Sequence, residues 1–167
     1  LGFVLAQKTQ NKRKKKSSNL KKTLRRIRQF HRQNPTTMIE IWLQDEMRMG
    51  LHGILSRQWG RRGERLQVHK QTEYEWVYMY GATNPFQGKS TSLLLPEVNT
   101  LGMNLFLETL SSQVTVGAHA FVFLDRAAWH RAKSLKIPTN IELILLPAYS
   151  PDLNPIEQVW GYLKNLF

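Results

Sequence analysis

Hydrophobic residues follow two rhythms along the chain, and together they predict a mixture of strands and helices. Alternating or continuous apolar runs of about four to eight residues are typical of strands. Such runs predict strands over residues 39–46, 74–82, 90–97, 119–125 and 141–147. Apolar residues spaced three and four apart line one side of a helix. This spacing predicts helices from Leu20 to the Asn34-Pro35 pair, over 100–113 with Asn99 or Thr100 as its cap, over 127–135, and from Asn154 or Pro155 onward.

The order of these elements predicts an α/β fold. The first three strands precede helix 100–113, which favours an antiparallel opening. The later strands at 119–125 and 141–147 contain unbroken apolar runs and alternate with helical segments. Such runs are typical of parallel strands buried on both faces. We therefore expect a mixed five-stranded sheet flanked by helices, preceded by a basic N-terminal arm.

Charge is distributed very unevenly along the chain. The formal net charge is +12 at pH 7, and residues 1–39 carry 12 Lys and Arg and no acid. Residues 40–167 carry 12 Lys and Arg against 12 Asp and Glu. A basic arm on a neutral domain indicates a polyanionic partner, with DNA as the first candidate and an anionic membrane surface as the second. The candidate nucleic-acid contacts are Lys14, Lys15, Lys16, Arg25 and Arg26 in the arm, with Arg61 and Arg62 in a second basic cluster. The alternative for the arm is a solvated tail or linker.

Composition excludes several classes of protein. Cysteine is absent, which rules out disulfides and thiolate zinc sites and fits a reducing compartment. The sequence contains no apolar run near 18 residues, so no transmembrane helix is predicted.

Three acidic residues stand where ligands collect in α/β sheets. Asp45 ends the first strand, Asp125 ends the fourth, and Glu157 falls in the first turn of the last helix. The carboxyl ends of parallel strands share one edge of a sheet, and Mg²⁺ and Mn²⁺ prefer carboxylate oxygens. For any single acid, a turn or capping role is the alternative. Glu46 is a rival to Asp45, but side chains alternate along a strand, so the two cannot face one point.

Three sequence blocks carry a family resemblance. The stretch LPAYSPDLNPIEQVWGYLK, at residues 146–164, resembles the C-terminal signature of mariner-like insertion-sequence transposases, which are DDE superfamily endonucleases. FVFLDRAAWHRAKSL, at 121–135, resembles the block around the second acid of that family, and WLQDEMRMGL, at 42–51, resembles the first. The resemblance implies a ribonuclease-H-like fold in which Asp45, Asp125 and Glu157 are catalytic and hold two Mg²⁺ or Mn²⁺ ions.

The resemblance also implies an activity and an organisation. Water would cut a phosphodiester at the end of a mobile element, and the freed 3′-hydroxyl would then attack target DNA. Residues 1–37 would be the tail of a helix-turn-helix region, and residues 38–167 a catalytic domain that continues further in relatives. The implied partners are transposon ends, target DNA and a second copy of the chain, with no small-molecule substrate and no membrane. An insertion-sequence enzyme is expected in the cytoplasm of a prokaryote, associated with the nucleoid.

Two residues near Asp125 have open roles. Arg126 stands where many relatives have Asn, and we expect it to pair with a phosphate. His130 follows Asp125 by five residues. It is a candidate general base or phosphate contact, and the alternative is that it caps or packs the short helix.

Three other functions stay open at this point. The chain could be a DNA-binding fragment without activity, or a ribonuclease-H-type nuclease that cuts RNA–DNA hybrids. A membrane-surface protein held by the basic helix is the third. A transposase would cut DNA in a metal-dependent reaction, whereas an inactive DNA-binding fragment would not. A transposase would also carry out strand transfer, whereas a ribonuclease-H-type nuclease would not.

Overall fold

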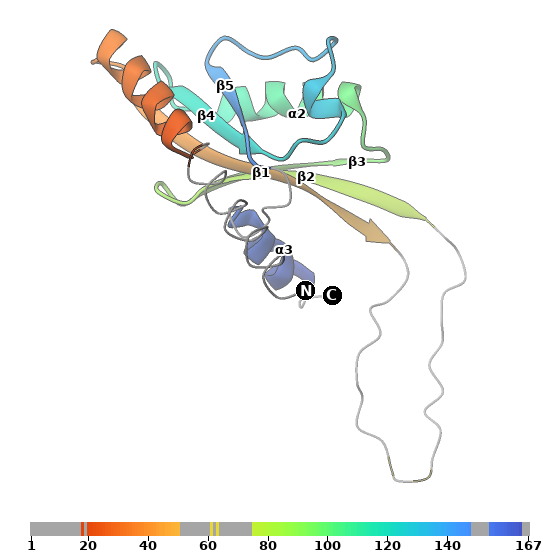
Figure 1. Cartoon of the computed structure of the whole chain (residues 1–167). Helices are drawn as coiled ribbons and strands as arrows, with labels where there is room; N and C mark the ends of the chain where they lie inside the picture. The colour runs from red at the N-terminus through yellow and green to blue at the C-terminus, as the bar shows by residue number, and fades with distance from the viewer. Residues whose placement is uncertain are drawn as a thin grey trace, which may run out of the picture.

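A five-stranded mixed sheet forms the centre of the protein. The structure is a computed structural model, and it describes residues 18, 20–50, 61, 63, 75–147 and 154–164. The sheet has the order β3-β2-β1-β4-β5. Its strands are β1 (Ile39–Gly50), β2 (Trp76–Asn84), β3 (Lys89–Leu95), β4 (His119–Leu124) and β5 (Ile141–Leu145). β1, β2 and β3 pair antiparallel, whereas β4 runs parallel to β1 and β5 runs parallel to β4. The predicted mixed sheet is confirmed (Figure 1).

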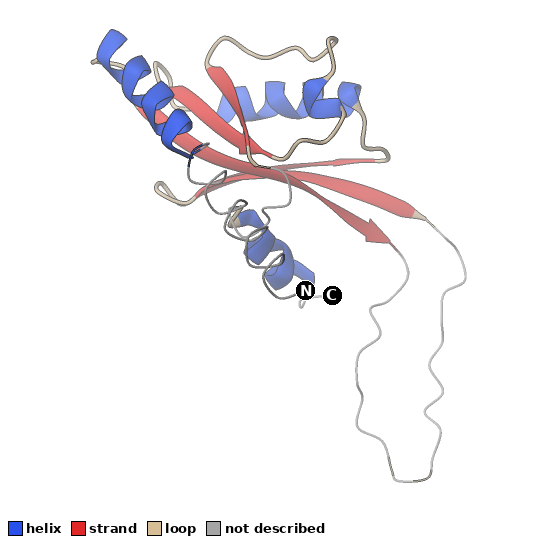
Figure 2. Ribbon diagram, in the orientation of Figure 1, coloured by secondary structure: helices blue, strands red, loops and turns tan. Residues whose placement is uncertain are grey.

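Helices cover both faces of this sheet, as Figure 2 shows. Helix α2 (Thr100–Gln113) lies on one face and helix α3 (Ile156–Lys164) on the other. Asn99 caps α2, because its side chain accepts a hydrogen bond of 2.8 Å from the Gly102 backbone N–H. The predicted bounds of α2 and its cap are therefore confirmed.

The side chains of β1 alternate between two hydrophobic clusters. Trp42 lies on the α2 side and packs with Tyr80 and Phe106, all fully buried. Met47 lies on the opposite side and packs with Ile156 and Trp160 of α3. Since alternate residues of a strand point to opposite faces, β1 supplies core to both layers and fixes which face each polar neighbour meets.

A further helix over residues 20–33 precedes β1, as its apolar spacing predicts. Phe30 stacks on His119 with ring centroids 4.3 Å apart and meets Phe121 edge-on. Arg26 forms an ion pair with Glu142 of β5. The basic helix therefore packs against the parallel half of the sheet, while Leu20 and Leu24 stay about half exposed. No helix in the described part of the chain is long and apolar enough to cross a membrane.

The segment predicted as a helix over 127–135 is different in the structure. Only one turn of 3₁₀ helix forms there, η1 (Trp129–Arg131). The His130 backbone N–H bonds to the Ala127 carbonyl, three residues back, and Ala132 then adopts an extended conformation. The Ala127 backbone N–H is held instead by the Asp125 side chain, at 2.8 Å. Such a bond satisfies an N–H at the start of a turn, and the turn stops when Ala132 becomes extended.

Candidate active site

Asp45 lies on the α3 side of β1, beneath the last helix. The Trp160 indole N–H donates a hydrogen bond of 3.0 Å to Asp45 Oδ2. The residue opposite Asp45 on β2 is Gly81. A Cβ atom at position 81 would lie 2.3 Å from Cη2 of Trp160, so a residue larger than glycine would clash with the indole ring. The sheet and α3 together fix the position of the Asp45 carboxylate.

Asp45 is held in a negative environment. Its pKa is raised from 3.8 to about 6, chiefly because the carboxylate is buried. The charges of Glu46 and Glu157 raise the pKa further, against the lowering effect of hydrogen bonds from the Glu46 backbone and the Trp160 side chain. Glu157 lies in the first turn of α3, where it is exposed. The charge of Glu157, the third predicted acid, therefore acts on Asp45, the first.

Asp125 follows the end of β4, the strand next to β1. In this parallel pair Leu43 lies opposite Phe123. These are the last paired residues of β1 and β4, so Asp45 and Asp125 each lie two residues beyond this paired part of their segments. The Asp125 side chain is 60% exposed. Among the residues that the structure describes, however, no three acidic or histidine side chains enclose a ready-made metal cage. The predicted acids share one edge of the sheet without closing around a point.

A buried histidine links Asp125 to Glu46. The His130 side chain is fully buried, with Nδ1 2.9 Å from Asp125 Oδ1 and Nε2 2.9 Å from Glu46 Oε1. Burial by itself would lower the pKa of His130, but the Glu46 hydrogen bond and the charges of Glu46 and Asp125 outweigh it and raise the pKa. Because both ring nitrogens face carboxylate oxygens, the doubly protonated ring satisfies both contacts.

Glu46 faces away from Asp45, as the alternation of strand side chains predicts. Its Oε1 lies within hydrogen-bond distance of three donor side chains. These are Gln44 Nε2 at 3.0 Å, Trp129 Nε1 at 3.2 Å and His130 Nε2 at 2.9 Å. Glu46 is thus engaged with η1 on the α2 side, whereas Asp45 points to α3.

The predicted nucleic-acid contacts have varied positions. Arg25 is exposed on the helix over residues 20–33, Arg26 pairs with Glu142, and Arg61 is exposed. Arg126 is exposed too, and its Nε donates to the Leu146 carbonyl at 2.9 Å. His130 is buried between two carboxylates, so a phosphate contact would require it to leave both. The remaining predicted contacts, Lys14, Lys15, Lys16 and Arg62, lie outside the described residues.

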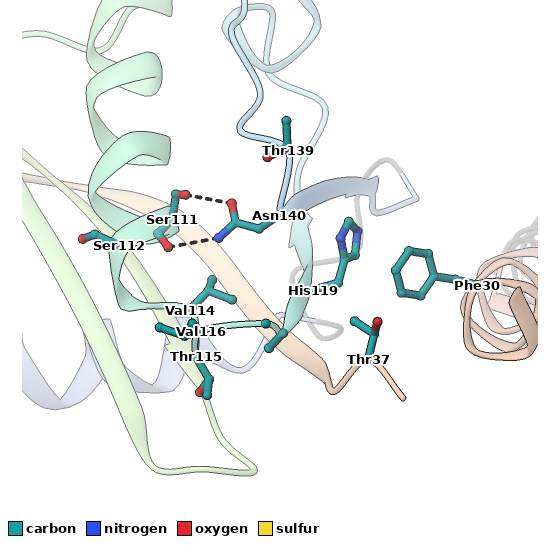
Figure 3. A pocket seen from close by; sticks show the side chains of 12 residues that line it. Phe30, Thr37, Ser111, Ser112, Val114, Thr115, Val116, His119, Thr139 and Asn140 are labelled. Carbon is teal, nitrogen blue, oxygen red and sulfur yellow. Dashed lines mark hydrogen bonds between the residues drawn. The ribbon is translucent and has the colours of Figure 1, made fainter. Parts of the chain in front are cut away.

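A pocket at the other end of the sheet is separate from these acids. His119 begins β4 there, whereas Asp125 follows its end. Ser111 of α2 bonds to Asn140 on the pocket wall, with 2.7 Å between Ser111 Oγ and Asn140 Oδ1 (Figure 3). This pocket lies a full strand length away from the acidic edge and takes no part in it.

Comparison with known proteins identifies the family. The sequence profile of the DDE superfamily endonucleases matches residues 40–167. This chain belongs to the DDE endonuclease superfamily. The DDE chain is also 43% identical over 90 residues to the uncharacterized protein y4pE/y4sA of Sinorhizobium fredii, across 54% of this chain and 67% of that protein.

Solved structures of Mos1 transposase share the fold of this DDE chain. The Mos1 paired-end complex with the left transposon end matches with a TM-score of 0.60 and 16% identity, covering 91% of this chain and 48% of that one. The Mos1 strand transfer complex matches with a TM-score of 0.58 and 18% identity, covering 76% and 41%. The predicted ribonuclease-H-like fold is thereby confirmed, and the sequence profile confirms the predicted DDE superfamily. The chain spans about half the length of these transposases.

Sequence reasoning missed Trp160 and Gly81 as supports of the acids, and it considered Glu46 only as a rival ligand to Asp45. Trp160, Gly81 and Glu46 each hold or make room for a neighbour of the site. Trp160 follows Glu157 by three residues and so shares its side of the helix, which is the one signal the sequence offered. Gly81 and Glu46 depend on contacts between strands and turns, which spacing along the chain does not reveal.

Proposed function

We propose that this chain is the catalytic part of a DNA transposase, with residues 38–167 as its catalytic domain and residues 1–37 as a basic arm. In this proposal the enzyme cuts a DNA strand and joins the freed 3′ end to target DNA, using two Mg²⁺ or Mn²⁺ ions on Asp45, Asp125 and Glu157. The observation that carries the proposal is that Asp45, within β1, lies under α3 and is affected by the charge of Glu157, while Asp125 directly follows the end of the neighbouring strand β4.

The donor set fits hard divalent cations. All three side chains offer carboxylate oxygens, which Mg²⁺ and Mn²⁺ prefer. The raised pKa of Asp45 means that burial, and to a lesser extent the charges of Glu46 and Glu157, makes its ionised form unfavourable in the absence of a counter-charge. When bound, a pair of divalent cations would neutralise the developing charge and activate water for in-line phosphoryl transfer.

Each acid has a distinct task in this proposal. Asp45 is fixed by Trp160 between β1 and α3, so it would anchor the centre. Asp125 is largely exposed and would face the DNA backbone. Glu157 is exposed on the first turn of α3 and would complete the ligand set from the opposite side.

The proposed partner is DNA, both as transposon ends and as target. Exposed cations on the helix over residues 20–33, with Arg25 among them, would contact phosphates and give salt-sensitive binding. The matched structures of Mos1 transposase include a complex with a transposon end. We propose a homodimer by the same likeness, acting at the nucleoid in the cytoplasm of a prokaryote.

The test is cleavage and strand transfer on a labelled DNA duplex with Mn²⁺ or Mg²⁺. The wild-type chain is compared with Asp125→Asn, and Glu108→Gln on the exposed side of α2 serves as the matched control. The proposal predicts metal-dependent products that persist in the control and fall by at least about a hundredfold in Asp125→Asn. Salt-sensitive binding without cleavage would indicate an inactive DNA-binding fragment. Cleavage confined to RNA–DNA hybrids would indicate a ribonuclease-H-type nuclease.

A further inference from the structure

Glu46 is the centre of a buried hydrogen-bond network behind the acidic edge. Its side chain is 9% exposed, and Oε1 lies within 3.2 Å of donors from Gln44, Trp129 and His130. Two of these donors come from η1, which follows Asp125 in the chain. Glu46 therefore ties the turn after β4 to strand β1.

His130 connects Glu46 to Asp125, because its two ring nitrogens contact one carboxylate each. Its Nδ1 lies 2.9 Å from Asp125 Oδ1, and the same oxygen accepts the Ala127 backbone N–H at 2.8 Å. Two donors on Oδ1 fix the rotation of the carboxylate and leave the lone pairs of Oδ2 for a cation. Without such restraint, an exposed carboxylate beyond the end of a strand would sample several rotamers.

We infer that His130, itself held by Glu46, is the positioning residue that sets the orientation of the Asp125 carboxylate for metal binding. The inference rests on the proposed metal centre and adds to it a defined network of outer contacts. Residues that orient metal-binding carboxylates by hydrogen bonds typically change metal affinity or activity about 10- to 100-fold when they are replaced. A histidine that only packed the turn would have no such effect on metal affinity.

The two ring nitrogens can be tested separately by amide substitutions. The amide nitrogen of Asn lies near the position of Nδ1, so His130→Asn keeps the donor to Asp125. The amide nitrogen of Gln lies near Nε2, so His130→Gln keeps the contact with Glu46 and loses the one to Asp125. Trp129→Phe is the matched control, because it removes another donor of Glu46 without touching Asp125.

The experiment measures Mn²⁺ affinity of the full chain by calorimetry without DNA, together with metal-free unfolding by circular dichroism. His130→Asn and Trp129→Phe should bind Mn²⁺ within about threefold of wild type, whereas His130→Gln should bind about 10- to 100-fold more weakly. DNA cleavage at subsaturating Mn²⁺ should follow the same order. Equal losses in His130→Asn and His130→Gln would overturn the inference, as would wild-type affinity in both.

Two further outcomes keep the test decisive. If His130→Asn does not fold, His130→Gln is compared with Trp129→Phe, since only the former loses the contact with Asp125. Equal Mn²⁺ affinity in that pair would overturn the inference. Absence of Mn²⁺ binding by the wild-type chain would instead overturn the proposed function, so the two failures are distinguishable.

Discussion

The raised pKa of Asp45 predicts that the metal-free protein is destabilised by its own site. Replacing Asp45 by Asn keeps the shape of the side chain and an oxygen that can accept the Trp160 indole N–H. The substitution replaces the ionisable carboxyl group by a neutral amide. We therefore expect Asp45→Asn to raise the free energy of unfolding at neutral pH, opposite to the usual effect of a mutation in a packed site.

The magnitude follows from the difference in pKa between the folded and unfolded states. The folded value is about 6 against 3.8 for a free side chain. Because the folded state holds this proton more tightly, its stability falls as pH rises through that interval. The full cost, reached above about pH 6, is at most about 3 kcal/mol, and solvent access to the partly exposed carboxylate reduces it to about 1–2 kcal/mol. Below pH 3.8 both states are protonated and the cost disappears.

The assay is urea unfolding in the presence of EDTA, at pH 4 and at pH 7.5. Asp45→Asn should exceed wild type by about 1–2 kcal/mol at pH 7.5 and by little at pH 4. Saturating Mn²⁺ should then stabilise wild type more than the variant, since only wild type regains a counter-charge. The same difference at both pH values, or a variant that is less stable at pH 7.5, would refute this reasoning.

Three further predictions concern the surroundings of the site. Gly81→Ala should lower stability by about 1–3 kcal/mol, because its Cβ would meet the ring of Trp160; chemical denaturation checks this against Gly161→Ala, which has open space and should not destabilise. Trp160→Phe removes the hydrogen-bond donor to Asp45, so the pKa of Asp45 should rise above about 6. NMR titration of the Asp45 carboxyl measures this, and an unchanged or lower pKa would contradict the assigned hydrogen bond. Arg25→Ala should reduce the slope of log affinity for DNA against log salt by about one, as measured by fluorescence anisotropy, and an unchanged slope would mean that Arg25 makes no phosphate contact.

The sheet topology could be predicted because the apolar pattern of each segment agrees with its place in the fold. The parallel strands carry unbroken apolar runs, and the Asn99 cap marks the start of α2. Strand β1 was predicted to end at residue 46 but continues to Gly50, since pairing with β2 extends to Trp76. The alternating residues Met47, Arg48 and Met49 form strand only with that partner, which a single segment does not reveal.

The candidate site could be predicted only in part. Asp125 follows the end of β4 and Glu157 lies at the start of α3, as predicted, but Asp45 lies within β1, five residues before its end, and not at a strand end. Alternation separates Glu46 from Asp45, also as predicted. The turn after β4 could not be predicted, because helical propensity over 127–135 is overridden by side-chain bonds. Asp125 holds the Ala127 N–H, and Glu46, distant in sequence, holds His130.

The proposed active site requires that Asp45, Asp125 and Glu157 bind the same pair of divalent cations. The most direct measurement is anomalous diffraction from crystals grown with Mn²⁺ and a DNA end. Two anomalous peaks are expected, about 3.5–4 Å apart, each within coordination distance of these carboxylates. Mn²⁺ bound elsewhere, or no peak beside Asp45 and Asp125 at saturating Mn²⁺, would contradict the proposed site.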